Sequence, residues 1–193
     1  MCVIIKRPAN RIIPNDFLIE AWQKNSDGWG VGFLTEGTLI ARRGMTLDEL
    51  LLANDSLPPE SEVIVHLRKA TVGDIRREMT HPFWVRPGLA LFHNGTIGRT
   101  APLPVGKSDT WQLARCLHAI LAGRGERQWA DFIRTDEFSK AIKGLLGCSM
   151  AVLLDRHGAL TFGRQWHRLT PQEWCAGMTG MDVSNTTAWR PRA

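Results

Sequence analysis

The residue at position two offers the clearest chemistry in this sequence. Small residues after an initiator methionine generally allow an aminopeptidase to remove it, so Cys2 would gain a free α-amino group. Such an amine has a reference pKa near 8, and a thiol has one of about 8.5. A nucleophile and a base suited to neutral pH would then belong to one residue. The plainer alternative is a small apolar residue in a first strand.

Three further segments carry side chains that suit a reaction on an amide. Arg68 ends a strand with a buried pattern, where a guanidinium can bind a carboxylate bidentately. Asn94 and Gly95 follow another strand and offer a side-chain amide and a backbone N–H to an oxyanion. Asp109, at a helix start, can accept from an ammonium group. The alternatives are a plain Asn-Gly turn and a D-x-x-Q helix cap formed by Asp109 with Gln112.

The elements that must position these side chains follow from hydrophobic patterning. Their order is strands, a helix, strands, two helices and strands, which indicates an α+β fold with largely antiparallel sheets. The helix that starts at Thr46 has a capping box and ends before Pro58-Pro59. The other helices are predicted from Ser108 or Asp109 to Gly123 and over 136–146, and the strands over 2–5, 29–34, 38–42, 62–67, 89–93, 148–154 and 160–163.

Composition narrows the class of protein. The chain has 193 residues, a formal charge of +5 and 44% apolar residues, which predicts one globular domain over 1–193. Eight Trp and seven Phe exclude disorder throughout. No apolar run approaches the roughly 20 residues of a membrane span. Only five residues precede Lys6, too few for a signal peptide, so we expect a cytoplasmic protein.

Cysteine spacing and charge exclude other kinds of site. The four cysteines are far apart and form no C-x-x-C pair, so we expect free thiols, no metal and no cofactor. The basic residues are scattered rather than gathered into one block. Solvation of the surface explains them, and nucleic-acid binding is only a distant alternative.

The order and spacing of these motifs resemble the class II glutamine amidotransferases, which are N-terminal-nucleophile (Ntn) hydrolases. The resemblance spans essentially the whole chain, and the small stand-alone members with D-G-W-G and T-H-P-F are the most similar. It implies a four-layer αββα sandwich of two mainly antiparallel sheets. The segments that carry it are Met1-Cys2, Ser26–Phe33, His66–Gly73, Thr80–Phe83, Phe92–Thr96 and Ser108–Thr110. A weaker match continues through the strands at Met150–Leu154 and Val183–Asn185.

The resemblance implies catalytic roles for three residues. Cys2 would attack the side-chain carboxamide of L-glutamine, with its own amine as the base. Asn94 and Gly95 would hold the oxyanion of the tetrahedral intermediate. Ammonia would leave, and water would cleave the γ-glutamyl thioester to glutamate.

The resemblance also implies a substrate-binding set. Arg68 would hold the α-carboxylate of glutamine and Asp109 its α-ammonium group, which would select a free amino acid. Thr71 and His81 are expected beside them, His81 as part of the wall or as a residue that orders a loop. Two more histidines, expected in the core or just behind the site, are His66 and His93.

The sequence departs from the family pattern in two respects. Lys24-Asn25-Ser26 replaces the Arg-Gly pair that the large synthases carry before the segment matching Asp27-Gly28, so the support of Cys2 on that side is open. The chain also leaves no room for a synthase domain to receive the ammonia. We therefore expect a glutaminase half-reaction and a separate acceptor-binding subunit, while the oligomeric state cannot be read from the sequence.

Two other functions are compatible with these residues. One is an N-terminal cysteine hydrolase of another amide or γ-glutamyl compound. The other is a catalytically silent module that binds an amino acid, or that binds a protein through a tryptophan-rich surface. That surface would include Trp166, Trp174 and Trp189.

Overall fold

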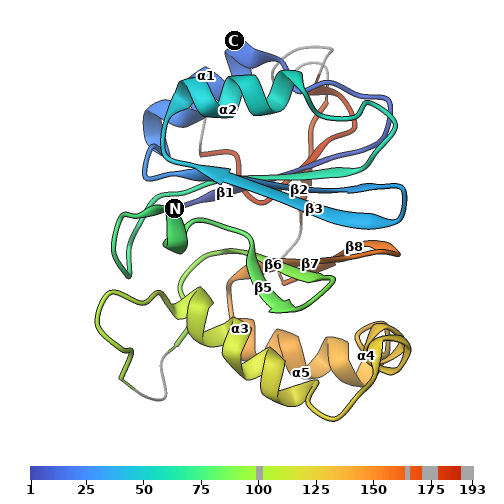
Figure 1. Ribbon diagram of the computed structural model, residues 1–193. Helices are drawn as coiled ribbons and strands as arrows, with labels where there is room; N and C mark the ends of the chain where they lie inside the picture. Colours follow the sequence, from blue (N-terminus) through green and yellow to red (C-terminus); the bar gives the residue numbers. More distant parts are fainter. Residues whose placement is uncertain (99–101, 164–165, 171–177, 188–193) are drawn as a thin grey trace.

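Two β-sheets lie face to face between two layers of helices in the computed structural model (Figure 1). The structure describes residues 1–98, 102–163, 166–170 and 178–187. Helices α1 (Asn15–Lys24) and α2 (Leu47–Asp55) cover the outer face of one sheet. Helices α3, α4 and α5 cover the outer face of the other. The predicted α+β, four-layer αββα architecture is confirmed.

All strand pairs in the described parts of the two sheets are antiparallel. The six-stranded sheet has, in spatial order, β3 (Thr38–Gly44), β2 (Trp29–Thr35), β4 (Val63–Leu67), β1 (Val3–Arg7), β10 (Asp182–Val183) and β9 (His167–Arg168). The four-stranded sheet has β5 (Phe83–Arg86), β6 (Leu89–Asn94), β7 (Met150–Asp155) and β8 (Gly158–Phe162). Its helices are α3 (Asp109–Ile120), α4 (Glu126–Phe132) and α5 (Asp136–Leu146), and a 3₁₀ turn covers Arg77–Met79.

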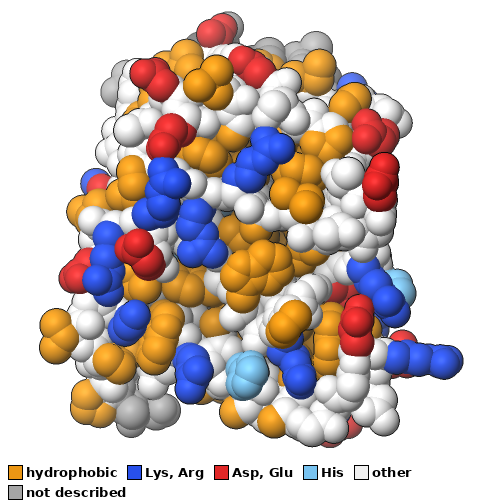
Figure 2. Space-filling view, viewed as in Figure 1, with side chains coloured by type: hydrophobic (Ala, Val, Ile, Leu, Met, Phe, Trp, Pro, Cys, Tyr) orange, Lys and Arg blue, Asp and Glu red, His pale blue; other side chains and the backbone are white. Residues whose placement is uncertain are grey.

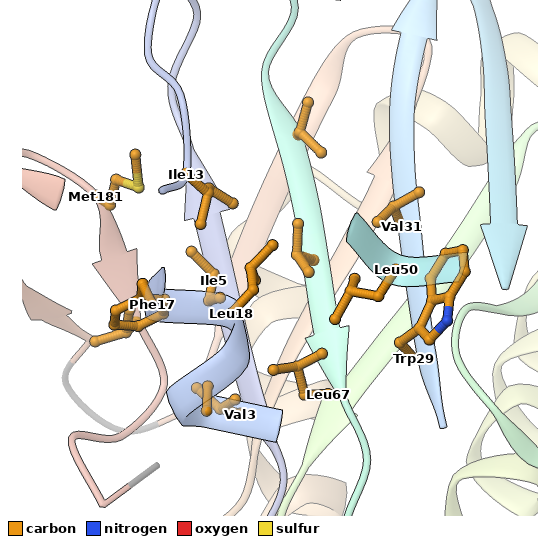
Figure 3. Close-up of a cluster of buried hydrophobic side chains, with 14 of the residues drawn as sticks. Val3, Ile5, Ile13, Phe17, Leu18, Trp29, Val31, Leu50, Leu67 and Met181 are labelled. Atoms are coloured by element: carbon orange, nitrogen blue, oxygen red, sulfur yellow. The ribbon is translucent and has the colours of Figure 1, made fainter. Parts of the chain in front are cut away.

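The first strand shows how the layers are built. Successive side chains of a strand point to opposite faces of its sheet. Val3 and Ile5 pack with Phe17 and Leu18 of α1 (Figure 3), whereas Ile4 points into the space between the two sheets. The apolar run after Cys2 is therefore buried on both faces, which fixes the backbone next to Cys2.

Glycines on one face of β2 bring the two sheets close together. Val31 points to the helix layer, while Gly30 and Gly32 face the other sheet. A Cβ atom on Gly32 would lie 2.9 Å from the Phe92 ring, and one on Gly30 would lie 1.6 Å from the carbonyl oxygen of His81. The alternation of glycine along β2 thus makes room for the opposite sheet and for the segment that carries His81.

Most predicted elements are confirmed, some with small shifts in their ends. The capping box of α2 is present, with Thr46 accepting from the Glu49 N–H, and α5 covers the predicted residues 136–146. The strand predicted from Cys148 begins instead at Met150, because Gly147 and Cys148 form the turn after α5. Sequence patterning missed α1, α4, β5, β9 and β10.

Cys2, Cys116 and Cys148 carry free thiols, whereas Cys175 lies outside the described residues. Trp166 packs against the cluster between the sheets, and the other two tryptophans of the suggested binding surface lie outside the described ranges. Figure 2 shows Lys and Arg side chains interspersed with acidic and apolar ones on one face. None of the described helices is long and apolar enough to cross a bilayer.

Candidate active site

A pocket opens beside the start of β1. It brings together residues that are far apart in the sequence, including six of the seven predicted site residues. Asn94 does not line the pocket, although Gly95, which follows it, does. The lining residues are Cys2, Arg68, Lys69, Ala70, Thr71, Val72, His81, His93, Gly95, Ser108, Asp109 and Thr110.

The sulfur of Cys2 is held by the backbone of the segment that follows β4. The Lys69 N–H donates to Cys2 Sγ at 3.3 Å, and Sγ lies 3.4 Å from the Lys69 carbonyl oxygen, to which the thiol can donate. Burial raises the pKa of the Cys2 thiol, and the Lys69 N–H and the Arg68 charge oppose that rise. Met1 precedes it with 66% of its surface exposed.

Asp27 explains part of the D-G-W-G motif, for which the sequence suggested no role. Its backbone N–H donates to the Arg68 carbonyl, and its carboxylate accepts from the Ala70 N–H at 2.8 Å. Asp27 therefore fixes both ends of the short segment that contains Lys69. Since Lys69 contacts the Cys2 sulfur, this carboxylate positions Cys2 indirectly.

The stretch that replaces the expected Arg-Gly pair supports Cys2 through the C-terminal segment. Lys24 Nζ donates to the Thr187 carbonyl at 2.9 Å, and the Thr187 N–H donates to Asn185 Oδ1. Asn185 Nδ2 in turn donates to the Cys2 carbonyl at 2.6 Å. Asn185 was part of a weak resemblance only, because no local pattern reveals a contact across 183 positions.

Arg68 lies in the pocket wall with its guanidinium already oriented. It is 3% exposed and donates to the carbonyl oxygens of Asp74, at 2.8 Å, and Val72, at 3.3 Å. Burial lowers the pKa of Arg68, and the charges of Cys2, Asp27 and Asp109 counter that effect. An arginine has five N–H donors, so donors remain for a carboxylate in the pocket.

Asp109 provides an anionic group in the same pocket. It is 6% exposed, and its two oxygens accept from the Ile97 and Thr110 N–H groups, both at 2.8 Å. The alternative in which Asp109 caps α3 with Gln112 is wrong. Ser108 is the N-cap residue and accepts from the Trp111 N–H. The Asp109 carboxylate is thus left to shape the pocket.

Asn94 and Gly95 end β6 in a conformation that needs glycine. Gly95 has a φ of +134°, and a Cβ there would lie 2.4 Å from Ser149 Oγ. Asn94 is 3% exposed, and its side-chain amide contacts Ser184 Oγ at 2.8 Å. A side chain at position 95 would therefore collide with Ser149, and the Asn94 amide is held at the end of β6 by Ser184.

Two buried histidines, His81 and His93, line the pocket, and a third, His66, lies against the ring of His81. The rings of His66 and His81 lie 3.8 Å apart, and His93 Nδ1 lies 2.9 Å from Thr110 Oγ1. Burial lowers the pKa of His66 to about 3 and that of His93 to about 4, and it places the pKa of His81 well below its usual value. All three rings are therefore neutral at pH 7.

These histidines predict a loss of stability in mild acid. The unfolded chain gains protons as the pH falls through about 6.5, whereas the buried rings stay neutral until about 3 to 4, so the stability present above pH 6.5 is lost on acidification. At pH 5, His66 and His93 should each cost about 2 kcal/mol. Urea midpoints at pH 7 and pH 5 measure this. His66→Gln should reduce the difference and exposed His157→Gln should not; equal pH dependence in all three proteins would refute the prediction.

Among the residues that the structure describes, none of the His, Cys, Asp and Glu side chains form a group of three that could hold an ion. The pocket itself combines the Cys2 thiol with the Arg68 guanidinium and the Asp109 carboxylate.

A four-layer αββα sandwich whose first strand directly follows a cysteine is the architecture of the Ntn hydrolases. A family model described as glutamine amidotransferases class-II matches residues 19–135, which is more than half of the chain. The chain belongs to that family. The matched range does not reach Cys2 or Asn185, so their roles depend on the geometry described above. No curated protein sequence matches the chain.

Solved structures support the same fold. One is glutamine phosphoribosylpyrophosphate amidotransferase from B. subtilis in complex with ADP and GMP, with a TM-score of 0.50 and 17% identity over 81% of this chain. Another is described as the allosteric regulatory enzyme of purine biosynthesis, with a TM-score of 0.50 and 16% identity over 95% of this chain. The matches cover 35% and 41% of those longer chains.

Proposed function

We propose that this protein hydrolyses the side-chain amide of free L-glutamine to glutamate and ammonia. One observation carries the proposal: a single pocket presents the Cys2 thiol together with the cationic Arg68 and the anionic Asp109. A free amino acid carries a carboxylate and an ammonium group on one carbon, so these two charges match its α-carbon end. The family supports glutamine as the source of the amide.

The reaction begins with removal of Met1, which frees the α-amine of Cys2. The thiol proton passes to this amine, and Sγ attacks the carboxamide carbon. The carbonyl oxygen becomes an oxyanion, which accepts from Asn94 Nδ2 and the Gly95 N–H. The α-ammonium group of Cys2 protonates the departing nitrogen, so ammonia leaves and a γ-glutamyl thioester remains. Water then adds to the thioester, and its collapse returns glutamate and the thiol.

The direct test is glutamate release from glutamine by the purified protein. Intact-mass measurement establishes first whether Met1 has been removed. Processed protein should release glutamate and ammonia in equal amounts. If processed protein releases neither from glutamine but does hydrolyse another γ-glutamyl amide, the substrate assignment is wrong and the alternative amide hydrolase stands. If processed protein hydrolyses none of the amides tested, the alternative of a catalytically silent binding module is favoured.

Replacing Asp109 with asparagine should selectively impair use of the amino acid end. The variant lacks the negative charge that pairs with the α-ammonium group, so we expect kcat/KM for glutamine to fall about 10²-fold. The fall in kcat/KM should be much smaller for glutaramate, which lacks that amine. The ratio of kcat/KM for the two substrates should therefore collapse in Asp109→Asn.

The ratio separates recognition from general damage. Because the Asp109 oxygens also accept from Ile97 and Thr110, the substitution can disturb the loop as well as the charge. Such damage would lower kcat/KM equally for both substrates. An unchanged preference for glutamine over glutaramate would show that Asp109 does not bind the α-ammonium group.

We also propose a separate acceptor-binding subunit. Ammonia in neutral water is mostly protonated and a poor nucleophile, so its transfer requires an acceptor bound close to the site that releases it. Co-expression with neighbouring gene products followed by affinity purification identifies candidates. A true acceptor takes up ¹⁵N from side-chain-labelled glutamine; a co-purifying protein that takes up none and leaves glutamate release unchanged is not the acceptor.

The remaining expectations belong to the same proposal. We place the protein in the cytoplasm, where the three described free thiols would stay reduced. We also treat 1–193 as one glutaminase domain that needs no cofactor. Both statements can be tested by cell fractionation and by activity of the purified chain in the presence of a chelator.

A further inference from the structure

A serine from the far end of the chain connects the nucleophile strand to the proposed oxyanion donor. Ser184 follows β10 and is 8% exposed. Its N–H donates to the Ile4 carbonyl at 2.9 Å, and its Oγ accepts from the Ile4 N–H at 2.8 Å. The same Oγ lies 2.8 Å from the Asn94 side-chain amide. One residue thus holds β1 of the first sheet and the end of β6 of the second.

The hydrogen bonds around Ser184 are incomplete when Asn94 Nδ2 points at it. A hydroxyl can accept two hydrogen bonds but must donate its single proton. With Nδ2 as the neighbour, Ser184 accepts from both Ile4 and Asn94, and its proton finds no acceptor among the described residues. Asn94 Oδ1 is also buried and has no hydrogen-bond partner within the described part of the chain. Two buried polar groups would then be unpaired.

Rotating the Asn94 amide by 180° gives the Ser184 proton an acceptor at no steric cost. The two ends of an asparagine amide have nearly the same shape, and the hydrogen-bond network decides between them. In the rotated form the Ser184 O–H donates to Asn94 Oδ1 while its Oγ still accepts from Ile4. Asn94 Nδ2 then takes the buried position that has no hydrogen-bond partner among the residues described by the structure.

An N–H donor that is buried and lacks an acceptor points to a group supplied by the substrate. Gly95, the next residue, lines the pocket with Cys2. Ser184 contacts Ile4, two residues after Cys2, so it couples the nucleophile strand to this donor. The missing acceptor is therefore the oxyanion that forms when Cys2 attacks an amide.

We propose that Ser184 is a positioning residue, whose hydroxyl donates to Asn94 Oδ1 and thereby turns Asn94 Nδ2 toward the oxyanion. This inference rests on the proposed amide hydrolysis. The hydroxyl does not touch the substrate, so its whole effect passes through Asn94. Without it, the amide can adopt the orientation that presents an oxygen to the developing negative charge.

A double-mutant cycle tests this dependence. Asn94→Ala should lower kcat about 10² to 10³-fold, as the loss of an oxyanion donor does. Ser184→Ala should lower kcat at least about 10-fold and leave KM within about threefold, because Asn94 acts in the transition state. The double variant should match Asn94→Ala alone. Ser184→Thr keeps a hydroxyl and should recover most of the activity.

Controls separate positioning from stability. Ser61→Ala removes another hydroxyl, one that donates to the Leu34 carbonyl outside the pocket, and should leave kcat unchanged. If Ser184→Ala does not fold, Ser184→Cys serves instead, because a thiol is a weak donor. The inference would be overturned if the fall in kcat of the double variant equalled the product of the two single falls, or if Ser184→Ala kept the kcat of the wild type. The proposed function would stand in both cases.

A measurement independent of activity completes the test. Neutron diffraction of the deuterated wild-type protein distinguishes the amide nitrogen from the oxygen and shows the hydroxyl deuterium. The inference requires Oδ1 of Asn94 to face Ser184; finding ND₂ there would overturn it. This readout remains decisive if the protein proves inactive on glutamine, which would be a failure of the proposed function alone.

Discussion

Replacing Cys2 with alanine should abolish glutamate release, with a fall in kcat of at least about 10⁴-fold. The substitution removes the one thiol among the described residues that line the pocket, while the Arg68 and Asp109 charges remain. Glutamine should therefore still bind, and its affinity measured by calorimetry should stay within a few-fold. Cys116→Ala is the matched control, since it removes an exposed thiol on α3 and should leave kcat unchanged.

The second part of this prediction concerns the amine of Cys2. Protein with a permanent extension before Cys2 keeps the thiol but has an amide in place of the base, so it should lose most of its activity. A diazo-ketone analogue of glutamine should label Cys2 alone in processed protein. Full glutamate release by Cys2→Ala, or by protein whose mass still includes Met1, would refute the mechanism.

Substituting alanine for Gly30 should unfold the protein or destabilise it by more than about 4 kcal/mol. The added Cβ would lie 1.6 Å from the His81 carbonyl oxygen and 2.6 Å from its carbonyl carbon. Both are backbone atoms, so no side-chain rotation can relieve the clash. The segment carrying His81 would have to leave β2, and the pocket wall would move with it.

A second glycine provides the control for this prediction. Gly144 lies in α5, and a Cβ there would meet nothing within 4 Å. Gly144→Ala should therefore stabilise the helix by about 1 kcal/mol. Urea unfolding of both variants beside the wild type measures the two effects. A Gly30→Ala protein whose free energy of unfolding lies within about 1 kcal/mol of the wild type would contradict the packing described here.

Local patterns predicted much of the fold because they act over a few residues. The alternation in β4, the capping box at Thr46 and the apolar face of α3 each depend on neighbours within one or two turns. Helix α1 was missed since it begins after Pro14 without a side-chain cap. Strands β9 and β10 have two residues each, too short for periodicity to reveal.

The sequence by itself determined the types of the reactive groups and their order: a cysteine at position two, an arginine after one strand, Asn-Gly after another and an aspartate at a helix start. It also indicated an α+β fold, because strand and helix periodicities are local properties of the chain. Ser108 rather than Asp109 caps α3, and this detail already required the three-dimensional positions of the side chains.

Only the tertiary structure decided how these groups are held. Asp27 fixes the segment that binds the Cys2 sulfur. Ser184 and Asn185, which lie far along the chain, bind the backbone of Ile4 and of Cys2. Contacts between residues so distant depend on how two sheets stack, and the glycines of β2 set that spacing. No local periodicity encodes such a distance, because it arises from packing between layers rather than from any one segment.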